Sequence, residues 1–171
     1  MNLSWLALLS ASAVLAQSSP VSRQGAYWVQ TETQAVGVMR GSRLRVQTKG
    51  SVIFTGKEGT RGSVTVVKRV RARTESEART LLSAAVLQTT LARHSGRVRL
   101  SMPQRSPIAA EMQITAPANL AEVVVETQGG EVQIRNVEGR VSAESGGGPI
   151  LLDRIGGDAI GRTAGGDIRL G

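Results

Sequence analysis

Seven arginines at alternate positions in three segments are the residues whose type and spacing best suit chemistry. They are Arg43, Arg45, Arg69, Arg71, Arg73, Arg97 and Arg99. Mostly aliphatic residues occupy the intervening positions, as on a β-strand with one buried face. If these strands pair in one sheet, its outer face carries guanidinium groups that bind phosphate or carboxylate with two hydrogen bonds. The pattern favours an anionic ligand. A solvated face that discourages edge pairing is the alternative.

Residues that support catalysis or metal binding are scarce. The chain has no cysteine, which excludes thiolate nucleophiles, disulfides and cysteine zinc sites. Its one histidine, His94, lies between two strand-like segments and is expected in an exposed turn. GGD at 156–158 and 165–167 lacks the second half of a calcium-binding nonapeptide, so no metal is expected. The carboxylates are not paired, and we expect no cofactor and no enzymatic activity.

The start of the chain resembles a secretory signal. Residues 1–16 are apolar and end in small residues, which predicts cleavage between Ala16 and Gln17, although no lysine or arginine precedes the run. We therefore expect an exported protein in the periplasm, the outer envelope or the extracellular space.

Charge is divided unevenly along the sequence. Residues 1–108 carry a net charge of +12, whereas residues 109–171 carry −4. A basic segment of this kind indicates an anionic partner. For an exported protein this means envelope polysaccharide, lipopolysaccharide or lipid headgroups. Envelope proteins are further candidate partners. Nucleic acid is disfavoured by export and by the few aromatic residues available for stacking.

The last third of the chain is periodic. TQGGEVQI (127–134), SGGGPILL (145–152) and TAGGDIRL (163–170) begin 18 residues apart. Glycine recurs every nine residues, at Gly130, Gly139, Gly148, Gly157 and Gly166. In most units aliphatic residues follow two and four positions later, as in Val132 and Ile134. The spacing predicts a short strand plus a turn in each unit, two units in each 18-residue coil, and a β-solenoid with an aliphatic seam. An antiparallel meander with nine-residue hairpins stays open, as do handedness and oligomeric state.

The whole chain is expected to be all-β. Residues 17–39 are assigned to a linker and a first strand. Residues 40–117 form a basic β-rich body with hairpins around Lys49-Gly50 and around His94, and one short helix at 75–86. Residues 118–171 form the glycine-punctuated repeat. Because the repeat ends abruptly without a cap, we expect that the chain is truncated and that coils continue beyond Gly171.

The segment ITAPANLAEVVVETQGGEVQIRNVEGRVSAESGGGPILL, with GSRLRVQTKGSVIFTG upstream and the helix before LARHSGRVRL, resembles the bacterial putative-adhesin family. The resemblance covers roughly 40–171. It implies a cell-envelope domain of unknown function built from β-strand repeats, and it supplies no catalytic residues. A secreted binding, adhesin-like or structural protein is therefore the favoured function. A regulatory or sensory envelope module that docks a membrane partner is the alternative, and a carbohydrate-active β-helix enzyme is a third reading.

Overall fold

The computed structural model describes residues 16–59 and 61–171, which form strands and one helix. The predicted signal peptide lies outside the described residues except for Ala16, which is exposed. The strands are β1 (Gln17–Ser18), β2 (Ser22–Gln24), β3 (Tyr27–Val36), β4 (Arg43–Thr48), β5 (Ser51–Lys57), β6 (Gly62–Val70), β7 (Val86–Ala92), β8 (Ser95–Ser101), β9 (Ala109–Pro117), β10 (Glu122–Thr127), β11 (Val132–Val137), β12 (Arg140–Ser145), β13 (Ile150–Ile155), β14 (Ala159–Thr163) and β15 (Ile168–Leu170), and the helix is α1 (Glu75–Ser83). The all-β prediction is confirmed at this level.

The strands form two facing sheets. Sheet A has nine strands, in the order β1-β3-β6-β9-β5-β11-β13-β15, with β2 also paired to β3. Sheet B has six strands, in the order β14-β12-β10-β4-β8-β7. Neither sheet closes on itself. Aliphatic side chains from the inner faces of both sheets form one core between them.

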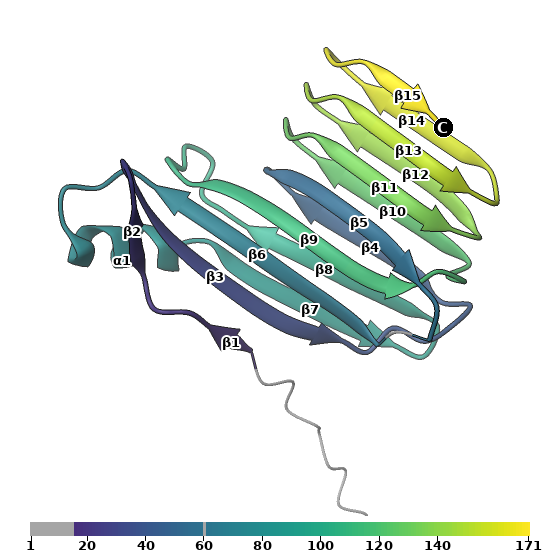
Figure 1. Ribbon diagram of the computed structural model, residues 1–171, viewed down its shortest axis with the longest axis horizontal. Coiled ribbons are helices and arrows are strands. Elements are labelled where there is room, and N and C mark those ends of the chain that lie inside the picture. Colours follow the sequence, from purple (N-terminus) through teal and green to yellow (C-terminus); the bar gives the residue numbers. More distant parts are fainter. Residues whose placement is uncertain (1–15, 60) are drawn as a thin grey trace, which may run out of the picture.

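From β10 onward, successive strands alternate between the two sheets (Figure 1). Each pairs in parallel with the strand 18 residues later, as in Val123 with Val141 and Val132 with Ile150. This parallel register rules out the antiparallel meander for residues 122–170. The strands β4 and β5 join the same stack, since Val46 pairs with Val125 and Val52 with Val132. Both sheets therefore continue across the predicted boundary at residue 117.

The repeated glycines are explained by how closely the turns stack. A Cβ on Gly148 would lie 2.2 Å from the carbonyl oxygen of Gly130, one coil below. The hydroxyl residue at the start of each repeat forms hydrogen bonds within its own turn and to the turn 18 residues earlier. Ser145 Oγ donates to the Gly130 carbonyl at 3.0 Å and accepts from the Gly148 N–H at 2.8 Å. Thr127 and Thr163 make equivalent bonds in neighbouring coils. Each hydroxyl thus accepts a hydrogen bond from a backbone N–H of its own turn and donates one to a backbone carbonyl of the previous turn.

The predicted aliphatic seam is buried in its earlier coils and open in the last one. Ile134 is 0% exposed and Leu152 is 1% exposed, and the two strands pair in register. Leu170 aligns with Leu152 but is 68% exposed, and Ile168 and Ala159 are also exposed. The expectation that these three residues are buried is wrong, because within the described chain no further coil packs over them.

The hairpin predicted around Lys49-Gly50 is also wrong. The strands on either side, β4 and β5, lie in different sheets and face each other across the core. Leu44 and Val46 point inward from one side, and Val52 and Phe54 from the other. Alternating polarity is the same for a hairpin and for an arch between two sheets, so the pattern cannot distinguish them. The hairpin around His94 is confirmed, because β7 and β8 pair antiparallel.

The helix and the first strands differ from expectation mainly at their ends. Helix α1 ends at Ser83 rather than residue 86, and Val86 already belongs to β7. The helix is capped at its start, since Thr74 Oγ1 accepts from the Glu77 N–H and the Glu77 carboxylate accepts from the Arg73 N–H. Residues assigned to a linker include β1 and β2, which pair with β3 and form the edge of sheet A.

Candidate anion-binding face

The seven predicted arginines are not brought together on one sheet. Arg43 and Arg45 on β4 and Arg97 and Arg99 on β8 share the outer face of sheet B, and we call these four the arginine face. The other three belong elsewhere: Arg69 is the penultimate residue of β6 in sheet A, and Arg71 and Arg73 follow that strand. The prediction of one seven-arginine surface is therefore wrong, because β6 pairs with β3 and β9 rather than with β4 or β8.

Two like-charged side chains stand directly opposite each other within the arginine face. Arg45 pairs in register with Arg97, and Gln47 pairs with Arg99 (Figure 1 shows β4 and β8 side by side). Arg45 is compensated by Glu126 at 3.6 Å. Among the residues that the structure describes, the guanidinium groups of Arg97 and Arg99 have no hydrogen-bonding or ionic partner. Like charges placed opposite on neighbouring strands are unfavourable unless an anion relieves them.

The outer edge of the arginine face is balanced by acids of the repeat. Arg43 lies 3.6 Å from Glu122, which is in register with Arg140, and Arg140 lies 3.1 Å from Asp158. This row alternates in sign across β4, β10, β12 and the turn before β14, and its members are exposed except for the half-buried Glu122. Such exposed pairs contribute about 0–1 kcal/mol each. Arg97 and Arg99 lie outside this row and have no acidic partner among the described residues.

Two open hollows border these arginines. One has a volume of ≈ 410 Å³, and its polar lining consists of Arg43, Arg45, Arg97 and Glu122 together with Thr90 and Ser95 of the neighbouring hairpin. The other is larger, ≈ 600 Å³, and lies over the carboxyl ends of β4, β8, β10 and β12. Its lining residues are Gln47, Thr48, Lys49, Arg99, Leu100, Ser101, Met102, Glu126, Thr127, Gln128, Glu144 and Gly146. Guanidinium and hydroxyl donors on a shallow surface suit phosphate or carboxylate groups of an extended ligand.

Two of the three remaining arginines have local contacts. The Arg71 guanidinium donates to the Tyr27 hydroxyl at 2.9 Å and lies 4.9 Å from the centre of that ring. Arg73 donates its backbone N–H to Glu77 at the start of α1. Arg69 lies on the outer face of sheet A beside Ala109. None of them extends the arginine face.

The structure also places the residues considered for metal binding. His94 is exposed in the turn between β7 and β8, as predicted, and its carbonyl accepts from the Arg43 N–H at 3.0 Å. Asp158 pairs with Arg140 and Asp167 with Arg169. Within residues 16–59 and 61–171, no three histidine, cysteine or acidic side chains gather as metal ligands.

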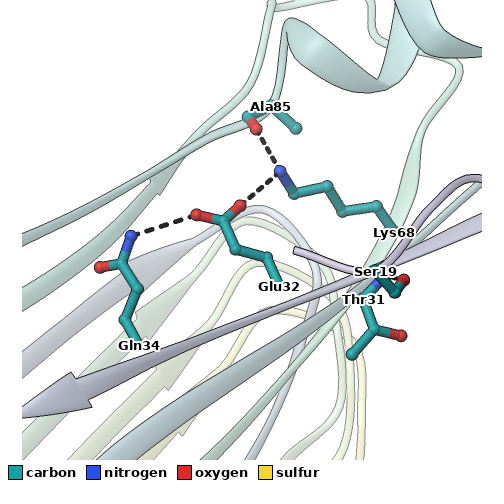
Figure 2. Close-up of polar contacts among 6 residues, drawn as sticks. All are labelled: Ser19, Thr31, Glu32, Gln34, Lys68 and Ala85. Atoms are coloured by element: carbon teal, nitrogen blue, oxygen red, sulfur yellow. Dashed lines mark hydrogen bonds and ion pairs between the residues drawn. The ribbon is translucent and has the colours of Figure 1, made fainter. Parts of the chain in front are cut away.

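A buried polar network went unrecognised in the sequence. Lys68 is 3% exposed, and its ammonium donates to Glu32 at 2.8 Å and to the Ala85 carbonyl at 2.6 Å (Figure 2). Gln34 donates to the other Glu32 oxygen at 3.1 Å, and the Thr89 hydroxyl lies 3.4 Å from Gln34. The network joins β3 and β6 of sheet A to the segment after α1 and to β7, the last strand of sheet B. It therefore links the two sheets. The sequence did contain an indication of this network: Lys68 alternates in step with the inward-facing valines of β6, so its side chain is expected to point into the core.

Comparison with solved structures shows the fold. A putative cell adhesion protein from Clostridium sporogenes superposes with a TM-score of 0.52 over 83% of this chain and 98% of its own, at 10% sequence identity. A putative lipid binding protein and a putative adhesin, both from Parabacteroides distasonis, give TM-scores of 0.47 and 0.41 at 12% and 9% identity. They cover 82% of this chain and 59% and 64% of their own lengths. The resemblance to the putative-adhesin family is confirmed at the level of the fold.

Sequence comparisons add no closer relative. No family profile and no curated protein sequence matches the chain. In the part of the chain that the structure describes, no helix is long and apolar enough to cross a membrane.

Proposed function

We propose that this chain is an exported cell-envelope protein with a binding, adhesin-like role, and that the outer face of sheet B is its binding surface. The ligand is anionic and carries phosphate or carboxylate groups, as envelope glycans, lipopolysaccharide and lipid headgroups do. No catalytic step is part of this proposal.

One observation carries the proposal: Arg97 and Arg99 are exposed, lie on one face next to Arg45, and have no partner among the described residues. Most exposed cations of the repeat region do have an acidic partner, as Arg140 and Arg169 do. Unpaired guanidinium groups beside a hollow are free to form paired hydrogen bonds with an incoming oxyanion.

We also propose that the coils formed by β4-β5, β10-β11, β12-β13 and β14-β15 are part of a β-solenoid. The parallel pairing and the 18-residue register support this reading. Each coil adds about 4.8 Å to the stack. A rigid stack of this kind would hold the arginine face at a constant shape and present a long surface beside it.

The experiment that tests the proposal is a binding assay of the purified chain without its signal segment. Anionic lipid vesicles, lipopolysaccharide and peptidoglycan are each offered at low and moderate salt. Each basic side chain near an anionic surface contributes about 1 kcal/mol, so Arg97→Gln with Arg99→Gln should weaken binding by about 30-fold. Binding by the unmodified chain should also fall as salt rises. The arm with the tightest binding identifies the source of the anion.

The matched control is Arg69→Gln with Arg169→Gln, which removes two positive charges from sheet A. Its affinity should stay within about threefold of the unmodified chain, because both sites are distant from the arginine face. If this control loses affinity as strongly as the Arg97 and Arg99 variant, attraction follows net charge alone and the assigned face is wrong. Turnover of polysaccharide by the pure chain would refute the non-enzymatic role.

A further inference from the structure

The larger hollow on sheet B is lined by charges of both signs. Arg99 and Lys49 lie on one side, and Glu126 and Glu144 lie on the other. The Lys49 ammonium already donates to the Pro103 carbonyl at 3.0 Å, whereas Arg99 has no partner in the described chain. The hollow is therefore not a purely basic site.

Two glutamates of this hollow form a like-charged pair across neighbouring strands, as Arg45 and Arg97 do on β4 and β8. Glu126 on β10 and Glu144 on β12 stand directly opposite each other on parallel strands. Glu126 accepts from Gln47 at 2.6 Å and lies 3.6 Å from Arg45. The Glu144 side chain has no hydrogen-bonding or ionic partner within the residues that the structure describes, although Arg162 of β14 stands in register with it on the other side. Two carboxylates in this relation repel each other, and a cation between them would relieve the repulsion.

The spacing of the two unpaired groups selects a ligand that carries both charges. Arg99 on β8 is separated from Glu126 by β4 and from Glu144 by β4 and β10. Neighbouring strands are about 4.8 Å apart, so the backbones of β8 and β10 are about 10 Å apart. All three side chains line the hollow, and each is long enough to bring its charge several ångströms away from its own strand.

We propose that this hollow binds a zwitterionic group, with its phosphate or carboxylate on Arg99 and its ammonium between Glu126 and Glu144. The inference rests on the proposed function for the anionic end and adds the cationic end. It restricts the ligand to amine-bearing phosphates and amino-acid-like ends, and it disfavours simple polyanions at this position.

The test compares pairs of soluble probes that share the anionic group, of which only one member carries an ammonium. Phosphoethanolamine is compared with glycerol phosphate, and dialanine with N-acetyl-dialanine, by calorimetric or NMR titration of the full chain. The zwitterion of each pair should bind about fivefold more tightly than its analogue, as expected for one additional exposed ion pair. The pair that binds more tightly identifies whether phosphate or carboxylate is preferred.

The decisive variant is Glu144→Gln, which keeps the shape of the side chain and removes its charge. Affinity for phosphoethanolamine should fall and affinity for glycerol phosphate should rise, so that the two converge. Glu131→Gln, on sheet A, is the matched control and should keep the fivefold preference. An unchanged thermal midpoint for both variants shows that folding is not the cause.

Failure of this inference can be told apart from failure of the proposed function. If the unmodified chain binds both members of a pair equally while Arg97→Gln with Arg99→Gln still weakens vesicle binding by about 30-fold, the zwitterion site is refuted and the anion-binding face stands. If Glu144→Gln keeps the preference for phosphoethanolamine, the assignment of the ammonium to this position is also refuted. If Arg97→Gln with Arg99→Gln binds both the vesicles and the soluble probes as tightly as the unmodified chain does, the proposed function itself is refuted.

Discussion

Gly148→Ala tests the stacking of the coils at a single atom. The added Cβ would lie 2.2 Å from the Gly130 carbonyl oxygen and 2.4 Å from its carbon. Because ordinary contacts begin near 3.4 Å, the turn must move by roughly 1 Å. That movement strains the Ser145 hydrogen bonds to Gly130 and Gly148. Overpacking costs about 1–3 kcal/mol and a lost hydrogen bond about 1 kcal/mol, so we expect about 3 kcal/mol of destabilisation.

The neighbouring glycine provides the control. No atom lies within 4 Å of a Cβ placed on Gly147, so Gly147→Ala should change stability by less than about 1 kcal/mol. For a chain of this size, each kcal/mol moves the thermal midpoint by about 2–4 °C. Circular dichroism melts should therefore show Gly148→Ala lower by about 6–12 °C, with Gly147→Ala close to the unmodified chain. Equal midpoints for the two variants would refute the close approach of successive turns.

Other changes probe the core and the polar network. Lys68→Met should lower the free energy of unfolding in urea by about 3 kcal/mol, because it leaves the Glu32 carboxylate nearly buried and uncompensated. Adding Glu32→Gln should restore most of that loss. A double variant as unstable as the single one would contradict the ion-pair explanation. Val132→Asp places a charge at a position that is 0% exposed and should cost more than about 4 kcal/mol, which a normal melt would disprove. Ser145→Ala should cost about 2 kcal/mol by chemical denaturation, whereas Ser145→Thr should be nearly neutral because threonine occupies the equivalent position in two other coils; equal losses would mean that the hydroxyl is unimportant.

The repeat was the most predictable part of the fold. Nine-residue spacing carries both the turn and the inward parity, so Val132, Ile134 and Leu152 were placed correctly from the sequence. The coil formed by β4 and β5 could not be found in this way. A long insertion, residues 58–121, separates it from β10, and no fixed interval survives across that insertion. Its pairing is a property of the three-dimensional stack rather than of local spacing.

The candidate site was predictable only in part, and for a related reason. Alternation placed Arg43, Arg45, Arg97 and Arg99 on outer faces, which the structure confirms. It could not show that β6 pairs within sheet A, so Arg69 was grouped with them incorrectly. Strand order is set by long-range packing, and a periodic pattern reports only which face of a strand is buried.

The most direct test of the binding face is residue-level NMR mapping of the labelled chain during titration with glycerol phosphate or with small anionic bicelles. We predict that amide and guanidinium shifts concentrate on β4 and β8, at Arg45, Arg97 and Arg99, and that they weaken as salt rises. Strands β3 and β6 of sheet A should be unaffected. Shifts concentrated at Arg69, or spread evenly over all exposed basic residues, would contradict the account.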